Sequence, residues 1–347
     1  MMPKTRNKIT TNRQHGFCVR RGVVQTWSVV LLINISNKLK LCAPKPARTQ
    51  SPETLCVSLQ NHQIDNITEI KIKKMKSIYF CLLLFFVTIS SCTNAKQPKD
   101  KVPTHDEFTI VSKQVGETRN INVWTPPEYK TSTDSLPVMY MADGGIIDED
   151  FPHIANTLAE LIKAKKIPPM ILVGIENTQR RRDLSGPTEI EKDKEIAPIV
   201  GGSEKFRAFI KEELFPEINK RYRTTSKRSI IGESLSGLFV VETFFLSPEM
   251  FDNYIAFDPS IWWNNHYLVR TAKEHLTNFP KTEKRIWFAG SSAEDISQYT
   301  NSLAEIFKAE NMPNIKWIYS PEPKEKHNTI FRATKEKAII WTFNKTE

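Results

Sequence analysis

A serine in a sharp turn is the residue around which chemistry can be built in this chain. Residues 230–239 read Ile-Ile-Gly-Glu-Ser-Leu-Ser-Gly-Leu-Phe, and an apolar run to residue 246 follows. An apolar strand end, a Gly-x-Ser-x-Ser-Gly turn and a helix-forming run place a serine hydroxyl at an exposed, strained elbow. Small residues are needed two positions on either side, and Gly232 and Ser236 supply them. The segment predicts Ser234 as a nucleophile; the alternative is a turn that only joins a strand to a helix.

A serine nucleophile needs a histidine to take its proton and a carboxylate to fix the imidazole tautomer. Of the seven histidines in the chain, His327 is the one that follows the last expected strand, 315–319. Glu294 and Asp295 follow the expected strand 285–288. The order serine, acid, histidine is that of α/β-hydrolases. We take Glu294 as the first choice for the acid and Asp295 as the second, with N-capping of the next helix as the alternative role for Asp295.

The elements that must position these residues alternate along the chain. Segments 108–112 and 119–124 alternate apolar and polar residues, which indicates an antiparallel pair. Apolar runs then predict buried strands, and periodic segments between them predict helices. This order favours one doubly wound, mostly parallel sheet with helices on both faces, and ligands then bind at the carboxyl ends of the strands. The expected buried strands are 136–141, 170–175, 228–231, 254–257, 285–288 and 315–319; the helices are 154–164, 204–222, 296–310 and the segment from 329; and 176–202 is a long loop or insertion.

Several segments together match one known family: 136–145, 173–175 with Arg182-Asp183, 206–218, the elbow to Phe239, 258–263 and His327. On these segments, from about Phe108 onward, the chain resembles the putative esterase family of α/β-hydrolases, which includes esterase D-like, feruloyl-esterase-like and enterochelin-esterase-like proteins. The resemblance implies an α/β-hydrolase fold and a serine esterase that works through an acyl-enzyme. Two departures matter: Ser236 stands where glycine is usual, and the acid varies within the family, some members working with serine and histidine only. Asp258, at the end of the preceding strand, is therefore a third candidate acid, a turn-starting role before Pro259 being its alternative.

The same fold implies an oxyanion hole made by the backbone N–H of Leu235 and by Gly144 or Gly145 in the loop after residue 141. Trp262 and Trp263 are candidate walls for the substrate, with a core position as the alternative. Arg182, within the run 180–182, is a candidate for binding an anionic substrate, with a solvated loop as the alternative.

Several function classes have no support in the sequence. A glycine-rich phosphate loop, histidine and cysteine residues at metal-ligand spacing and a basic-aromatic nucleic-acid pattern are all missing from it. We therefore expect no cofactor, no metal and no nucleic-acid partner. The expected substrate is a small-molecule or glycan-linked ester, with siderophore esters and feruloyl or acetyl polysaccharide esters as the natural classes. An acyltransferase of the same fold and a catalytically silent binding lipoprotein are the alternatives.

The N-terminal region differs from the rest in charge and cysteine content. Of the 49 Lys/Arg and 39 Asp/Glu residues, 14 and 3 lie in residues 1–92, so the remainder holds 35 and 36 and is nearly neutral. All five cysteines also lie in the first 92 residues. Lysines at 73, 74 and 76, an apolar stretch from 78 to 89 and Ser90-Ser91-Cys92 resemble a lipoprotein signal ending in a lipobox.

These features divide the chain as follows. Residues 1–74 are expected to be a disordered upstream extension, 75–91 the signal peptide, 92–105 a tether lipidated at Cys92, and 106–347 the esterase domain. A lipid anchor implies membrane attachment in the bacterial cell envelope, as a periplasmic or surface-exposed protein. Threonine rather than aspartate after Cys92 favours the outer membrane, by resemblance to known sorting signals.

Overall fold

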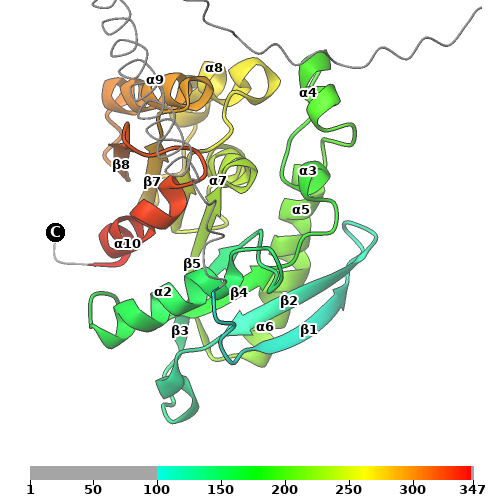
Figure 1. Cartoon of the computed structure of the whole chain (residues 1–347), viewed down its shortest axis with the longest axis vertical. Coiled ribbons are helices and arrows are strands. Elements are labelled where there is room, and N and C mark those ends of the chain that lie inside the picture. Colours follow the sequence, from blue (N-terminus) through cyan, green and yellow to red (C-terminus); the bar gives the residue numbers. More distant parts are fainter. Residues whose placement is uncertain (1–99, 345–347) are drawn as a thin grey trace, which may run out of the picture. The chain divides into compact units, whose positions relative to one another are not determined.

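The computed structural model describes residues 100–344, and eight strands in this part form one sheet in the order β1-β2-β4-β3-β5-β6-β7-β8 (Figure 1). The first two strands pair antiparallel with each other, and β2 pairs antiparallel with β4. From β4 to β8 every neighbouring pair is parallel. The predicted mostly parallel α/β fold is confirmed. The strands are β1 (Asp106–Val111), β2 (Thr118–Trp124), β3 (Leu136–Met141), β4 (Ile171–Ile175), β5 (Thr224–Glu233), β6 (Asn253–Phe257), β7 (Lys284–Gly290) and β8 (Ile315–Pro321).

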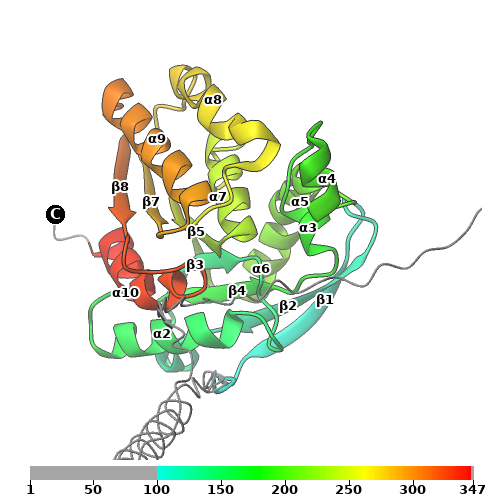
Figure 2. The same ribbon diagram turned by 45° about the horizontal axis from the view of Figure 1, so that its top comes forward.

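Helices cover both faces of the sheet, because the central strands are apolar on both sides. One face packs against α2 (Phe151–Lys163) and α10 (Ile330–Phe343), which lie side by side (Figure 2). The other face packs against α7 (Leu235–Leu246) and its neighbours. These neighbours are α5 (Ser203–Phe209), η2 (Ile210–Leu214), α6 (Phe215–Arg221), α8 (Trp263–Thr277) and α9 (Glu294–Glu310).

Two expected segments differ in detail. The single helix expected over 204–222 is α5 and α6 joined through the π-helical turn η2, with a proline as the second residue of α6. Proline lacks an N–H and its ring crowds the carbonyl one turn earlier, and a π turn accommodates both effects. The expected loop 176–202 contains two short helices, α3 (Arg180–Asp183) and α4 (Glu191–Ile196). A 3-10 turn, η1 (Pro127–Lys130), follows β2.

The residues that precede β1 are held against the domain. The Asp100 carboxylate lies 2.8 Å from Arg332 Nη2 of α10 and 3.2 Å from His153 Nδ1 of α2. Asn156 Nδ2 donates to the carbonyl of Lys101 at 2.8 Å. Residues 100–105, expected to belong to the tether, are therefore part of the folded domain. The expected extension, signal peptide and Cys92 lie outside the described residues. Among the helices of residues 100–344, none is both long enough and apolar enough to cross a membrane.

Candidate active site

The elbow predicted around Ser234 is present at the carboxyl end of β5. Ser234 has φ 59° and ψ −115°, a backbone conformation that is costly for a residue other than glycine. Its N–H donates to the carbonyl of Phe257 in the neighbouring strand at 2.9 Å. Its own carbonyl accepts from Leu238 N at 2.9 Å and from Ser260 N at 3.0 Å. Bonds to α7, β6 and the loop after β6 thus hold the strained residue in place.

Close packing explains the small residues on either side of the serine. A Cβ atom added at Gly232 would lie 2.6 Å from the carbonyl carbon of Ser236, closer than real Cβ contacts. At the other position, Ser236 Oγ accepts from Glu233 N and donates to Glu233 O, both at 2.8 Å. Ser236, which departs from the usual glycine, therefore fits the elbow and adds two hydrogen bonds to its turn.

Three side chains form a hydrogen-bonded chain that ends at the serine. The Ser234 hydroxyl donates to His327 Nε2, with the oxygen and nitrogen 3.0 Å apart. On the other side of the ring, His327 Nδ1–H donates to Asp258 Oδ2 at 2.7 Å. The tautomer is assigned by this network, because buried Asp258 can only accept while it is ionised. Serine, histidine and carboxylate are thus connected in the order required for nucleophilic catalysis.

The carboxylate that accepts the hydrogen bond from His327 is that of Asp258, whereas the sequence favoured Glu294. Glu294 and Asp295 are exposed in the first turn of α9, and the hydrogen bond to His327 Nδ1 is made by Asp258. The loop after β7 instead contributes Ser291, which the sequence did not single out. Its N–H donates to Asp258 Oδ1 at 2.6 Å, and its hydroxyl donates to Oδ2 at 2.7 Å. A serine directly after a strand end was the available signal, and it is a weak one.

Backbone conformation explains why Asp258 reaches the histidine. It has φ 45°, in the left-handed region that aspartate tolerates better than most residues. Its N–H donates at 3.0 Å to the carbonyl of Ala289 in β7. This bond fixes Asp258 at the end of β6, the strand beside β7. The strand end therefore points the carboxylate across the sheet edge toward the loop that carries His327.

Electrostatics at this edge favour a charged histidine. The hydrogen bond to Asp258, more than any other effect, raises the pKa of His327 above its ordinary value. Nearby Glu233 contributes in the same direction. Burial in turn raises the pKa of Glu233 to about 7 and that of Asp150 to about 6. The imidazolium that forms when the serine is deprotonated is thus stabilised by its neighbours.

The predicted oxyanion donors are only partly free. Leu235 is the first residue of α7, so its N–H has no acceptor within the helix and lies beside the nucleophile. The two glycine amides differ from expectation, because Gly144 N donates to Ile175 O at 3.0 Å and Gly145 N donates to Glu149 Oε2 at 2.6 Å. A Cβ at Gly144 would lie 2.2 Å from Ile175 N, so this glycine serves the close approach of the loop to β4.

The expected substrate-binding arginine is engaged elsewhere. Arg182 is bound by Glu117 and Asp183, and this pairing raises its pKa. Two positions earlier, Arg180 Nη2 donates at 2.7 Å to Asp143, in the loop after β3. Burial lowers the pKa of Arg180, but the hydrogen bond to Asp143 outweighs it and raises that pKa, and the charge of Glu233, the residue before the nucleophile, acts in the same direction.

The two tryptophans occupy different environments. Trp263 is buried, 5% exposed, and its Nε1–H donates to the carbonyl of Gly186 at 3.0 Å. Trp262 is half-buried, and the two rings lie 5.9 Å apart. Trp263 belongs to the core cluster and also lines a cavity of 340 Å³ beside α7.

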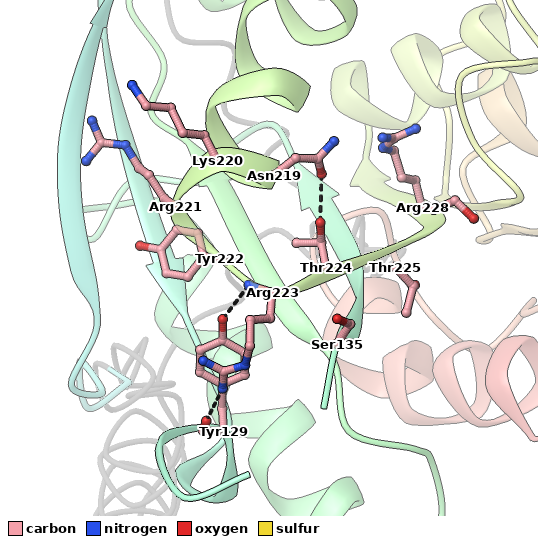
Figure 3. Close-up of a pocket in the computed structure, with 11 residues that line it drawn as sticks. Tyr129, Ser135, Asn219, Lys220, Arg221, Tyr222, Arg223, Thr224, Thr225 and Arg228 are labelled. Carbon is pink, nitrogen blue, oxygen red and sulfur yellow. Dashed lines mark hydrogen bonds between the residues drawn. The ribbon is translucent and has the colours of Figure 1, made fainter. Parts of the chain in front are cut away.

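A larger hollow of 650 Å³ lies at the opposite edge of the sheet, near the start of β5 (Figure 3). Its basic side chains do not converge. Lys220 and Arg221 extend to one side, and Arg228 lies on the opposite side (Figure 3). Arg223 lies against the ring of Tyr129. Arg223 also donates to the carbonyls of Tyr129 and Ser132. Within residues 100–344, no group of three or more His, Cys, Asp or Glu side chains is placed to hold a metal ion.

Comparison with known proteins gives consistent matches. The model of a family described as "Putative esterase" matches residues 112–341, more than half of the chain. Ferri-bacillibactin esterase BesA of Bacillus subtilis is 29% identical over 198 residues, covering 51% of this chain and 68% of its own. Siderophore triacetylfusarinine C esterase of Aspergillus fumigatus is 28% identical over 185 residues, covering 50% of this chain and 61% of its own.

Solved structures show the same fold. An IroE-like serine hydrolase from Shewanella oneidensis superposes with a TM-score of 0.64 at 23% identity, over 69% of this chain and 80% of that one. The BES protein from Bacillus cereus superposes with a TM-score of 0.62 at 23% identity, over 71% of this chain and 99% of that one.

Proposed function

The chain belongs to the putative esterase family and is a carboxylic ester hydrolase, and we propose that Ser234, His327 and Asp258 are its catalytic triad. The observation that carries this assignment is the hydrogen-bonded chain from Ser234 Oγ through both ring nitrogens of His327 to buried Asp258. The sequence predicts two of its members, Ser234 from the elbow pattern and His327 from its place after the last strand.

The proposed reaction proceeds in two steps. His327 Nε2 takes the hydroxyl proton while Ser234 Oγ attacks the ester carbonyl carbon, and the Leu235 N–H donates to the developing oxyanion. The tetrahedral intermediate then collapses, the alkoxide leaves with the proton from His327, and an acyl-serine remains. Water attacks the acyl-serine with the same histidine as base, which releases the carboxylic acid and restores the enzyme. Asp258 keeps the Nδ1–H tautomer throughout and stabilises the imidazolium.

The experiment is hydrolysis of p-nitrophenyl acetate by the purified protein. Ser234→Ala should abolish turnover, with an unchanged thermal unfolding profile as the control for folding. Turnover retained in this variant, on correctly folded protein, would sink the assignment.

For the natural substrate we propose a siderophore ester. The support is that the two curated relatives above carry the names of siderophore esterases. Feruloyl and acetyl esters of polysaccharides are the competing substrates. Values of kcat/KM for a catecholate trilactone, methyl ferulate and an acetylated xylan should rank the trilactone first. A preference of tenfold or more for either polysaccharide-type ester would reverse the assignment.

We further propose that the enzyme is a lipoprotein of the bacterial envelope, anchored through Cys92. The support is the basic, apolar and small-residue order that ends at this cysteine. Two or more acyl chains give stable attachment, whereas one is marginal. Cys92→Ser should release the enzyme from the membrane fraction and leave kcat/KM unchanged, measured by fractionation and esterase assay. A variant that stays in the membrane fraction would contradict lipid anchoring at this residue.

A further inference from the structure

The loop that follows β7 binds the triad acid through a single residue, Ser291. Its N–H donates to Asp258 Oδ1 at 2.6 Å, and its hydroxyl donates to Asp258 Oδ2 at 2.7 Å. The third hydrogen bond to this carboxylate comes from His327 Nδ1–H, to Oδ2 at 2.7 Å. Within residues 100–344, Ser291 therefore makes two of the three hydrogen bonds that the Asp258 carboxylate accepts.

Burial makes these hydrogen bonds important. Asp258 is 0% exposed, Ser291 is 2% exposed, and the ion-pair partner that the described residues give Asp258 is His327. A buried carboxylate without a lysine or arginine beside it has to be stabilised by hydrogen bonds to its charged form. The two from Ser291 do this whether or not His327 is protonated.

The orientation of the Ser291 hydroxyl is itself fixed. Ala293 N–H donates to Ser291 Oγ at 3.1 Å, so this oxygen accepts on one side and gives its hydrogen to Asp258 on the other. One donor on each carboxylate oxygen sets the plane of the carboxylate group. In that plane Oδ2 faces His327 Nδ1, and loss of the hydroxyl leaves the N–H on Oδ1 as the single contact from this loop.

The loop is rigid on both sides of this serine. A Cβ atom added at Gly290 would lie 2.4 Å from Thr300 Oγ1 of α9, so the chain enters the loop in close contact with that helix. On the other side, Ser292 N–H donates at 2.9 Å to the carbonyl of Glu325, in the segment that leads to His327. One short loop thus connects the acid to the segment that carries the histidine.

We propose that Ser291 is a positioning residue of the esterase, whose N–H and hydroxyl orient Asp258 so that Oδ2 holds His327 with Nε2 toward Ser234. This inference rests on the proposed triad and deepens it. Ser291 acts through Asp258 and does not touch the reacting atoms. Its loss should therefore change the rate of the chemical steps and leave substrate binding unchanged.

The first test is Ser291→Ala in the full chain, assayed with p-nitrophenyl acetate between pH 5 and 9. This variant keeps the N–H and removes the hydroxyl. Its kcat should fall about tenfold to a hundredfold, the effect of losing a hydrogen bond to a charged group, while KM stays within twofold. The acid limb of kcat/KM should move to lower pH, because the hydrogen bond from Asp258 is the main cause of the raised pKa of His327.

A pair of variants with the same shape separates the hydroxyl from packing. Ser291→Val and Ser291→Thr both add a methyl group, and Thr restores the donor, so Thr should recover most of the kcat that Val loses. The control is Ser302→Ala, which removes an exposed hydroxyl of α9 and should change neither kcat nor the acid limb.

The outcomes distinguish this proposal from the triad assignment. Parental kcat and an unmoved acid limb in folded Ser291→Ala, with Ser234→Ala inactive, would overturn the positioning role alone. A loss of activity in Ser291→Ala with an unmoved acid limb would also overturn it, because a purely structural defect has that signature. Hydrolysis that survives Ser234→Ala would instead overturn the triad itself.

Discussion

Replacing Asp258 with asparagine should lower kcat by about three to four orders of magnitude. The carboxylate uses Oδ2 for His327 Nδ1–H and the Ser291 hydroxyl, and Oδ1 for the Ser291 N–H. An amide can serve only one of these two sides as an acceptor. If its NH₂ group faces His327, the ring must take the tautomer with hydrogen on Nε2, and Ser234 loses its base. If its NH₂ group faces Ser291, two buried donors meet.

The magnitude follows from this choice. A buried donor left without an acceptor costs about 1–3 kcal/mol, so the variant populates the first orientation and the wrong tautomer. An amide in place of the triad carboxylate lowers kcat on the order of 10⁴ in a serine protease, or roughly 5 kcal/mol of barrier. The acid limb of the pH profile should also move to lower pH, because the hydrogen bond to Asp258 is the main cause of the raised pKa of His327.

The assay is kcat and kcat/KM for p-nitrophenyl acetate between pH 5 and 9. Glu294→Gln and Asp295→Asn are the matched controls, since both are exposed acids at the start of α9, and each should keep most of the activity. Activity of Asp258→Asn above a tenth of the parent value, or a collapse in Glu294→Gln, would refute the assignment of Asp258.

Three further outcomes are expected. Glu233→Gln should shift the acid limb of kcat/KM to lower pH, because the charge of Glu233 raises the pKa of His327 and neutral His327 is the base; an unmoved limb would contradict this coupling. Gly232→Ala should destabilise the fold and reduce activity, since its Cβ would lie 2.6 Å from the next turn of backbone; an unchanged midpoint of thermal unfolding would count against the tight elbow. Asp100→Ala should lower the midpoint of thermal unfolding and kcat together, because it frees Arg332 of α10. The charge swap Asp100→Arg with Arg332→Asp should recover part of the loss. Equal values for Asp100→Ala and the parent would contradict a role for this ion pair.

Local patterns were sufficient for the sheet, the elbow and the histidine. Ser234 follows from residues within five positions of it, because the strand end, the small neighbours and the helix are all contiguous in sequence. His327 follows from its place after the last strand. The acid could not be decided in this way. Two strand ends, those of β6 and β7, are neighbours in the sheet and both supply carboxylates. The left-handed φ of Asp258 aims one of them, and the sequence does not display that angle.

The oxyanion donors and the partners of the arginines were harder to predict from the sequence for the same reason. Whether the N–H of Gly144 is free depends on its hydrogen bond to Ile175, a residue of another strand far away in sequence. Arg180 and Arg182 stand two positions apart on one short helix, yet one binds Asp143 beside the elbow and the other binds Glu117. Side-chain direction on a single helical turn is set by packing partners that composition and periodicity do not reveal.

The most direct measurement is the mass of the protein trapped during turnover of p-nitrophenyl acetate. Acid quenching within the first turnover, followed by proteolysis and mass spectrometry, should find one acetyl group on the peptide that contains Ser234. The release of nitrophenolate should show a burst of one equivalent per enzyme. His327→Ala should lose both signals. An acetyl group on another residue, or full turnover without an acetyl-enzyme, would contradict the account of Ser234 as the nucleophile.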